Sequence, residues 1–304
     1  MMTKDNPRAG IWLMIAATFV FAAQDGISRH LADTYNVFMI VMVRYWFILL
    51  VLMAVSRVRS GSLFGDARTT QPFFQFFRGI VLAVEILVTI LSFTLLGLIE
   101  AHAIFAVYPL LIAALSGPVL KESVGWRRWA AIGVGFIGML IILQPGVKVF
   151  SPLSLVSFAG ALLFALYHLL TRMAAAKDSA ETSFFWTAIS GFIVMSAIGP
   201  FFWEPMLPED QIWMAVLCVT GALGHYLLIK AYEMAQASVV QPFAFMQLVF
   251  VSFIGVLVFG EHLPFSTAFG AAVIVAAGLF TLWRENRARK AALRAKAQAG
   301  TTGT

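Results

Sequence analysis

Hydrophobic residues occur along the chain in blocks of about 20, separated by short polar connections. An α-helix needs about 20 apolar residues to cross a hydrocarbon layer ~30 Å thick. The blocks do not show the alternation of apolar and polar residues over ~10-residue strands that is typical of membrane β-barrels. The pattern predicts ten membrane-spanning helices, at residues 10–31, 37–57, 73–96, 102–120, 127–144, 152–172, 182–202, 211–231, 238–259 and 265–283.

The composition supports this interpretation. Hydrophobic residues make up 61% and charged residues 12% of the 304 residues, whereas soluble domains have about 45–50% and about 25%. We therefore expect an all-α polytopic membrane protein in a lipid bilayer. A single cysteine, Cys218, excludes an internal disulfide and gives no metal site. The sequence has no Walker loop and no Cys/His cluster, so we expect no cofactor.

Positive charge is divided unequally between the two sets of loops. With the N-terminus placed in the cytoplasm, 18 of the 21 Lys and Arg residues fall on the inner side, while the outer side holds only Arg29 and Lys148. Because loops rich in Lys and Arg remain in the cytoplasm, we expect both termini there. The net charge of +6 comes mostly from the C-terminal tail, so it does not indicate a nucleic-acid partner. We expect the tail to lie against anionic lipid head groups.

The chain contains an internal repeat. Residues 159–172 (AGALLFALYHLLTR) resemble residues 16–29 (AATFVFAAQDGISR) at an offset of 143, so that Phe21 matches Phe164. The stretch LKESVGW around Glu122 and the stretch FGEHLPF around Glu261 correspond at an offset of 139, each at the end of a span.

The repeat unit is therefore five helices long. Five is an odd number, so the second unit enters the membrane from the opposite side, and the two repeats are inverted. Such repeats enclose a central site and are used for alternating access. The expected units are residues 1–146, the first five-helix repeat, residues 147–284, the second, and residues 285–304, a basic cytoplasmic tail.

These features resemble the drug/metabolite transporter superfamily, EamA-type. The resemblance rests on the two five-helix units, the paired glutamates Glu122 and Glu261, Arg44 in the second span, and the small residues of the fifth and tenth spans, and it covers residues 10–283. Among such transporters the chain looks most similar to the YddG-type exporters of aromatic amino acids. The resemblance implies a bacterial inner-membrane exporter whose cavity is lined by spans 1, 3, 4, 6, 8 and 9.

Polar side chains inside spans are costly in hydrocarbon and therefore mark candidate functional positions. Those of the two halves pair by repeat position, and with neighbouring aromatic residues they predict a polar, aromatic chamber near mid-depth. The chemistry suits a zwitterion with an apolar or aromatic side chain. Glu85 or Asp25 would meet its ammonium group, and aromatic rings would stack on its side chain. Its carboxylate would meet His168, His225 or Arg78. The candidate substrate-binding residues are Gln24, Asp25, Arg78, Glu85, Tyr108, Tyr167, His168, His225, Tyr226, Phe245 and Gln247.

Several of these residues have an alternative structural interpretation. Asp25 lies four residues before Arg29, the spacing of an intrahelical ion pair. Glu85 has no basic residue at the helical spacings, so it either meets substrate or bonds to another helix. Arg44 has room to snorkel outwards or to reach an acid such as Glu85 or Asp33, and the resemblance favours a structural role for it.

Residues near the span ends are given structural roles. We expect His102 and His262 to be solvated at outer span ends, and Glu122 and Glu261 to be helix-end or interface residues. The glycines and alanines of the fifth and tenth spans allow helices to approach closely. Two prolines are candidate hinges because proline removes a helix hydrogen bond; they are Pro109 and Pro242.

The sequence predicts a secondary exporter of amino acids, including aromatic ones. We expect one chain to work as a monomer on a small-molecule substrate. The alternative is an exporter or facilitator of another small metabolite or drug, such as a nucleotide-like compound, a sugar or a cation. An enzyme is not expected, since no span carries acids or histidines at helical spacing. Proton coupling through Glu85 or Asp25 and facilitated diffusion both remain open.

Overall fold

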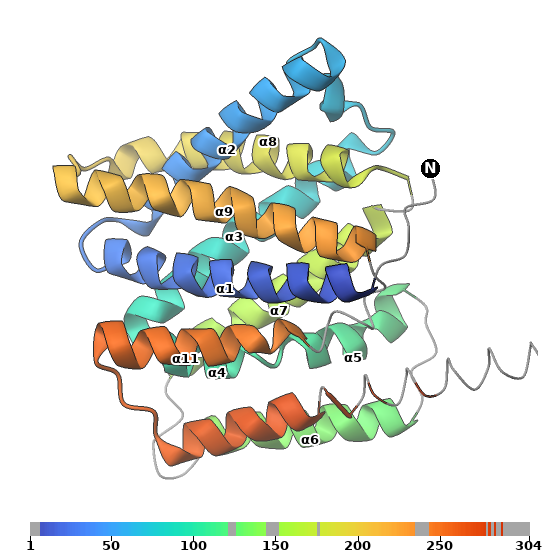
Figure 1. The fold of residues 1–304 in the computed structure, drawn as a ribbon, viewed down its shortest axis with the longest axis vertical. Coiled ribbons are helices and arrows are strands. Elements are labelled where there is room, and N and C mark those ends of the chain that lie inside the picture. The colour runs from blue at the N-terminus through green and yellow to red at the C-terminus, as the bar shows by residue number, and fades with distance from the viewer. Residues whose placement is uncertain are drawn as a thin grey trace, which may run out of the picture.

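The computed structural model describes residues 7–120, 126–143, 152–174, 177–234, 243–277, 279–280, 283 and 287. Throughout these ranges the regular structure is helical (Figure 1). The helices are α1 (Pro7–Ala32), α2 (Val37–Ser60), η1 (Gly65–Ala67), α3 (Pro72–Leu96), α4 (Leu98–Phe105), α5 (Tyr108–Leu120), α6 (Trp126–Leu143), α7 (Pro152–Ala174), α8 (Ala180–Ile198), η2 (Gly199–Phe202), α9 (Pro208–Met234) and α11 (Met246–Phe259), followed by an apolar helix at Phe265–Ala277.

Ten apolar helices correspond to the ten expected spans. Six are long and apolar enough to cross a membrane, and four shorter apolar helices take the remaining places, at Leu98–Ile112, Gly133–Ile142, Met246–Phe259 and Phe265–Ala277. The fourth span begins earlier than residue 102, because only Gly97 separates α3 from α4. Gly97 has φ 84°, which glycine adopts without steric cost, and this allows the abrupt reversal of the chain.

The two halves pack into each other. The most extensive helix contacts are those of α1 with α9 and of α3 with α7, and these helices lie near the middle of Figure 1. In repeat terms the first pair joins spans 1 and 8, and the second joins spans 6 and 3, so each pair is the inverted counterpart of the other. The site between them is therefore built from both repeats.

The fifth and tenth spans lie away from this centre, at the bottom of Figure 1. They contact each other through glycines: a Cβ on Gly138 would lie 2.8 Å from the carbonyl oxygen of Gly270, and a Cβ on Gly270 would lie 2.6 Å from that of Gly138. Larger residues would force the helices apart, so the expected packing role of the small residues is confirmed at this crossing.

The fourth and ninth spans are both interrupted near the centre. The fourth breaks at Ala106 and Val107, between α4 and α5, and the ninth breaks at Phe245, where α11 begins. Ala106 and Phe245 are 139 positions apart, the same offset that relates Glu122 to Glu261. Discontinuous helices that meet at a repeat interface are typical of transporter binding sites.

The two candidate hinge prolines relate differently to these breaks. Pro109 lies in the first turn of α5, just after the break, where a proline fits because the N–H groups of the first turn have no partner in the helix. Its hinge role stays a prediction. Pro242 lies outside the described residues, as do Glu122 and the boundaries expected near residues 146 and 284.

Glu261 ties together three segments at one end of the molecule. Its two carboxylate oxygens accept hydrogen bonds from the backbone N–H groups of Leu98 and Ile99, each at 2.8 Å, and so cap α4. Arg29 forms an ion pair with the same carboxylate and lies over the ring of Phe259, 4.3 Å from its centroid. The expected structural role of Glu261 is confirmed. The alternative that pairs Asp25 with Arg29 is wrong, because Glu261 is the partner of Arg29.

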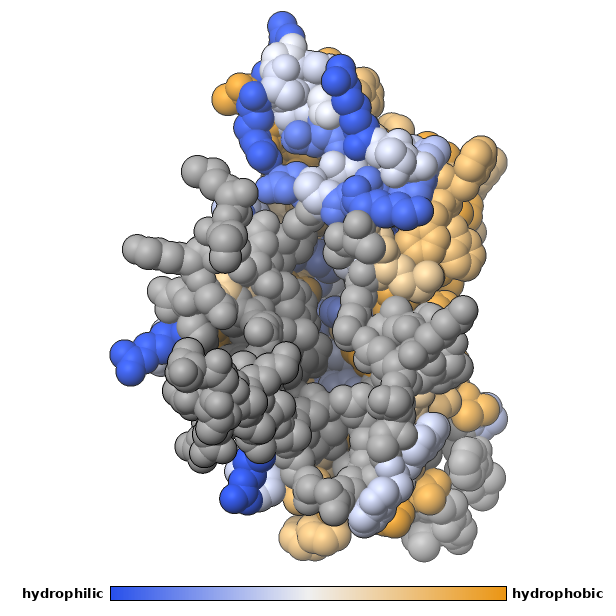
Figure 2. All heavy atoms as spheres, turned by 90° about the vertical axis from the view of Figure 1, so that its right-hand side faces the viewer, coloured by the Kyte–Doolittle hydropathy of each residue, from blue (hydrophilic) through white to orange (hydrophobic). Residues whose placement is uncertain are grey.

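The opposite end of the molecule carries exposed basic residues. Figure 2 views this end, and hydrophilic side chains gather at its top, over the end of α2 and the segment that follows, beside a hydrophobic flank. Arg57, Arg59 and Arg68 are exposed there. The sequence assigns these three arginines to the cytoplasmic side, and that orientation stays a prediction.

Candidate substrate cavity

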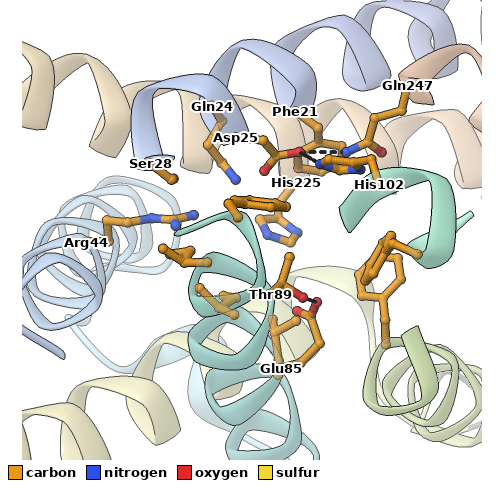
Figure 3. A pocket seen from close by; sticks show the side chains of 16 residues that line it. Phe21, Gln24, Asp25, Ser28, Arg44, Glu85, Thr89, His102, His225 and Gln247 are labelled. Carbon is orange, nitrogen blue, oxygen red and sulfur yellow. Dashed lines mark hydrogen bonds and ion pairs between the residues drawn. The ribbon is translucent and has the colours of Figure 1, made fainter. Parts of the chain in front are cut away.

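A polar cavity lies between helices of both repeats. It is lined by side chains from α1, α2, α3, α4, α7, α9 and α11, and Figure 3 shows them pointing towards a common space. The space open to the centres of water molecules is about 60 Å³. Five of the candidate residues from the sequence line it, namely Gln24, Asp25, Glu85, His225 and Gln247.

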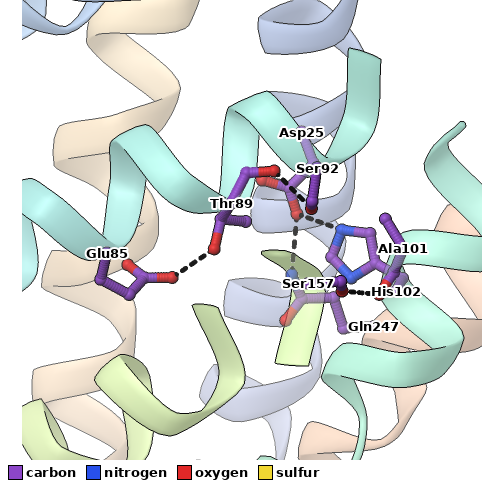
Figure 4. Close-up of polar contacts among 8 residues, drawn as sticks. All are labelled: Asp25, Glu85, Thr89, Ser92, Ala101, His102, Ser157 and Gln247. Atoms are coloured by element: carbon purple, nitrogen blue, oxygen red, sulfur yellow. Dashed lines mark hydrogen bonds and ion pairs between the residues drawn. The ribbon is translucent and has the colours of Figure 1, made fainter. Parts of the chain in front are cut away.

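One wall of the cavity is a triad of polar side chains from three helices (Figure 4). The Oδ2 atom of Asp25 on α1 accepts a hydrogen bond from Gln247 Nε2 on α11 at 2.9 Å and lies 3.1 Å from Nε2 of His102 on α4. The His102 side chain is only 4% exposed, and its ring is stacked on Phe93. The prediction of a solvated His102 is wrong, because α4 starts directly after Gly97 and directs this side chain inwards.

Glu85 on α3 forms a second polar group on the cavity wall. Its Oε1 accepts a hydrogen bond from Thr89 Oγ1 at 2.7 Å, one helical turn away (Figure 4). Within the described residues no cation lies within ion-pair distance of this buried carboxyl group. Thr89 therefore keeps one carboxyl oxygen in place while the other remains available to a ligand.

Arg44 on α2 also lines the cavity. The residue is 4% exposed, so the prediction that it snorkels outwards is wrong. Among the described residues its guanidinium has neither a hydrogen bond nor an ion pair, with Glu85, Asp33 or any other group. The sequence interpretation favoured a structural role for Arg44, but the structure gives this side chain no structural partner.

An aromatic cluster borders the cavity on the side of α4 and α7. Phe105 and Phe164 line the cavity, with ring centroids 5.3 Å apart. Tyr108 and His168 pack behind Phe164, at 4.9 and 4.5 Å between centroids. His168 Nε2 is buried and has no hydrogen-bond partner among the described residues. Tyr108 and His168 thus pack against a residue of the wall, and neither is among the residues that line the cavity.

Arg78 and Tyr167 lie in a different cluster, closer to the N-terminal end of α3. Arg78 donates to Tyr167 Oη at 3.2 Å, to Thr171 Oγ1 at 3.0 Å and to Thr187 Oγ1 at 2.8 Å, and also to Gln75 and to the Ser183 carbonyl. All these bonds join α3 to α7 and α8 or lie within α3. The sequence predicted that Arg78 binds a substrate carboxylate. In the structure its guanidinium is instead hydrogen-bonded to other residues of the protein.

Two further candidate residues lie outside the main cavity. Tyr226 is 53% exposed and lies near the ammonium group of Lys230, 5.8 Å from its ring centroid. Phe245 is buried at the break before α11 and, with Tyr108 and Gln247, lines a separate space of about 10 Å³. The structure therefore places Phe245 next to the cavity and Tyr226 away from it.

Two polar contacts, here called clasps, join the repeats at the two ends of the molecule. In the inner clasp, Oδ2 of Asp178 accepts hydrogen bonds from Thr69 at 2.6 Å, Gln75 at 2.7 Å and Gln71 at 3.0 Å. Burial acts to raise the pKa of Asp178, but these three hydrogen bonds outweigh it and hold the pKa below its ordinary value.

The outer clasp is its counterpart at the other end. Tyr35 donates to Asp210 Oδ2 at 2.7 Å and accepts from the Leu207 N–H at 3.0 Å. Tyr35 and Asp178 are 143 positions apart, the offset of the first repeat pair. Both clasps are formed in this structure.

Several lining residues were not proposed from the sequence. They include Ser28, Thr89, Phe93 and Phe105. For one other pair of lining residues the internal repeat did carry a signal. Phe21 and Phe164 are identical residues at matching repeat positions, and both line the cavity. His102 and Arg44 are polar residues within or beside spans. Only the packing of the helices brings both of them to the cavity.

Comparison with known proteins agrees with this architecture. The model of the EamA-like transporter family matches the chain twice, at residues 8–144 and 152–283. The chain belongs to the EamA-like transporter family. The EamA-like match accounts for both five-helix repeats and hence for nearly all of the described helices.

Related proteins have names that refer to metabolite transport. An S-adenosylmethionine uptake transporter of Rickettsia prowazekii is 26% identical over 91% of this chain and 94% of its own length. A riboflavin transporter of Vibrio cholerae is 27% identical over 95% and 98%, and one of Rhizobium johnstonii is 30% identical over 72% and 73%. A solved crystal structure with 15% identity gives a TM-score of 0.66 over 90% of this chain and 96% of that chain, a likeness of fold alone.

These relatives change the expected substrate. Within the EamA-like family they point to a small-metabolite transporter rather than an enzyme, and they support the alternative drawn from the sequence better than amino-acid export.

Proposed function

We propose that this EamA-like protein is a secondary transporter for S-adenosylmethionine or a closely similar metabolite, one that combines a heteroaromatic ring with charged groups, and that it works in the direction of uptake. The central cavity carries the proposal. It presents two buried acids, Asp25 and Glu85, a buried cation, Arg44, and the rings of Phe105 and Phe164 within one space built by both repeats. The named relatives support the same substrate class.

The charges of the cavity favour this substrate over a neutral one. Sulfonium and ammonium groups match Glu85 and Asp25 in sign, and an adenine ring is suited to stacking on Phe105 or Phe164. A riboflavin-like molecule has a larger ring system but no charged group for Arg44 or Glu85. Burying these charges against a neutral ligand leaves them uncompensated, which is unfavourable. Riboflavin is therefore the second candidate, supported by the aromatic cluster and by the relatives of that name.

Transport requires the cavity to change size. With both clasps formed, the space open to the centres of water molecules is about 60 Å³, which is room for several water molecules. The proposal is that each clasp opens in turn and widens the cavity towards one face, as alternating access requires. We also propose that the end carrying Arg57, Arg59 and Arg68 is cytoplasmic, that the membrane is the bacterial inner membrane, and that one chain forms the working unit.

The test is accumulation of labelled S-adenosylmethionine by cells that express the chain, compared with cells that carry an empty vector. We expect saturable uptake that is reduced by excess unlabelled S-adenosylmethionine and is not reduced by phenylalanine. Uptake equal to that of the empty-vector cells, with the protein present in the membrane, would contradict the proposal. Competition by riboflavin alone would select the second candidate.

A further inference from the structure

Two arginines are fully buried in the described part of the chain, and their surroundings differ. Arg78 is 1% exposed and makes five hydrogen bonds to protein groups. Arg44 is 4% exposed and makes none within the described residues. A buried charge without a partner is strongly unfavourable, and buried polar groups are almost always satisfied. An unpaired buried guanidinium that lines a cavity thus indicates a partner that enters the cavity.

Two more unsatisfied polar atoms line the cavity with Arg44. Oε1 of Gln24 and Oγ of Ser28 are buried and have no hydrogen-bond partner in the described structure, and both residues line the cavity with Arg44. Gln24 and Ser28 are one helical turn apart on α1 and lie on the same face of that helix. In Figure 3 Arg44 and Ser28 lie on the side away from His102 and Gln247, and Gln24 lies between them, beside Asp25.

Glycine on α9 keeps this side of the cavity open. An ideal Cβ built on Gly221 would lie 3.3 Å from a terminal nitrogen of Arg44 and 3.2 Å from Oε1 of Gln24. Arg44 and Gln24 therefore both approach the same bare stretch of backbone. A larger residue at position 221 would crowd both polar groups, so the glycine leaves the guanidinium accessible from the cavity.

We propose that Arg44 and Ser28 bind the carboxylate of the transported molecule, and that Gln24 Oε1 accepts a hydrogen bond from its neighbouring ammonium group. This proposal rests on the proposed function and adds to it the part of the substrate that decides specificity, an α-amino carboxylate. A guanidinium fork matches a carboxylate in a bidentate geometry, and the Ser28 hydroxyl supplies a further donor. The cavity has room for a head group of this size, and Phe105 and Phe164 of the aromatic cluster line the same cavity.

The test compares two substrates that differ only in the carboxylate: S-adenosylmethionine and its decarboxylated analogue, in which hydrogen replaces that group. Their apparent affinities are measured with purified protein in proteoliposomes, for wild type, Arg44→Gln, Arg44→Lys and two matched arginine controls. Arg68→Gln removes an exposed arginine, and Arg78→Gln removes the buried arginine that has protein partners.

We expect wild type to favour the carboxylated substrate by about 10- to 100-fold, the range for charge-assisted hydrogen bonds. Arg44→Gln should remove this preference and leave the affinity for the decarboxylated analogue within about twofold of wild type. Arg44→Lys should keep part of the preference, and Arg68→Gln should change nothing. If Arg44→Gln weakens both substrates equally, as a structural residue such as Arg78 is expected to do, the carboxylate proposal is wrong.

Failure of the proposed function has a different signature. If wild type transports neither compound, S-adenosylmethionine is not the substrate. The same variants are then tested by the thermal stability of the purified protein with methionine and with its decarboxylated amine. Stabilisation by methionine alone, present in wild type and lost in Arg44→Gln, would support carboxylate binding by Arg44. Equal melting temperatures with the two compounds in wild type would overturn it.

Discussion

Glu261 gives the sharpest prediction of stability, because its one carboxylate connects spans 1, 4 and 9 at the end of the molecule. The perturbation is Glu261→Gln, which keeps the shape of the side chain. The variant has one acceptor oxygen in place of two, so one of the backbone N–H groups of Leu98 and Ile99 loses its partner. It also leaves Arg29 without its ion pair, at a site where the arginine side chain is 18% exposed.

The expected magnitude follows from these losses. Loss of a helix cap costs about 1–2 kcal/mol, and removal of one partner of a largely buried ion pair costs about 3–5 kcal/mol. Because Arg29 keeps some contact with solvent, we expect a total of about 3–5 kcal/mol. At roughly 2–4 °C per kcal/mol for a chain of this size, the melting temperature should fall by about 10 °C.

The chain contains a convenient reporter for the assay. Cys218 is its single cysteine and is 3% exposed, so a fluorogenic thiol reagent reacts only when the protein unfolds. Glu204→Gln, which changes an exposed acid, is the matched control and should melt as wild type does. Arg29→Gln combined with Glu261→Gln should be less destabilised than the sum of the single variants. A fall of less than about 2 °C in Glu261→Gln would refute the reasoning.

Three further predictions concern the inner clasp and the cavity. Because the pKa of Asp178 is lowered in the folded state, its stabilising contribution is fully present above its ordinary pKa of 3.8 and is lost as the pH falls through the lowered value. Asp178→Asn should therefore have a lower melting temperature than wild type at pH 7, and this difference should shrink in acid. Tryptophan fluorescence measures the melting temperature at each pH. A difference that does not change with pH would contradict the lowered pKa of Asp178. Phe164→Ala should raise the apparent KM for S-adenosylmethionine by about 2- to 13-fold through loss of a stacking ring, and Phe201→Ala, at an exposed position, should leave KM unchanged. Thr89→Val should free the Glu85 oxygen that Thr89 holds and change the pH profile of transport while protein abundance stays constant, whereas an unchanged profile would show that this hydrogen bond does not tune the site.

The sequence was sufficient to predict the fold. Hydrophobic blocks fix the number of spans because hydrocarbon thickness sets their length, and the odd repeat unit fixes the inversion of the second half. The repeat also marked part of the site, since Phe21 and Phe164 match in sequence and both line the cavity. Five lining residues were identified because polar side chains are costly in hydrocarbon and therefore mark functional positions; they are Gln24, Asp25, Glu85, His225 and Gln247.

The remaining parts of the site depend on local geometry that a sequence pattern does not contain. His102 was expected at the surface because the fourth span was started too late; the one-residue turn at Gly97 shifts the helix and turns the histidine inwards. Arg78 and Arg44 look alike as intramembrane arginines, and only the packing of α3 against α7 and α8 gives the first its partners. The substrate also depends on more than residue types, since zwitterions of many shapes match the same set of charges.

The most direct test of the central claim is counterflow of labelled S-adenosylmethionine in proteoliposomes that contain only the purified protein. We predict transient accumulation of label when the vesicles are preloaded with unlabelled S-adenosylmethionine. Asp25→Asn should lose this exchange, because it lacks the carboxylate that contacts His102 and Gln247. Label that enters no faster than in protein-free vesicles, while riboflavin or an amino acid exchanges readily through the same preparation, would contradict the account.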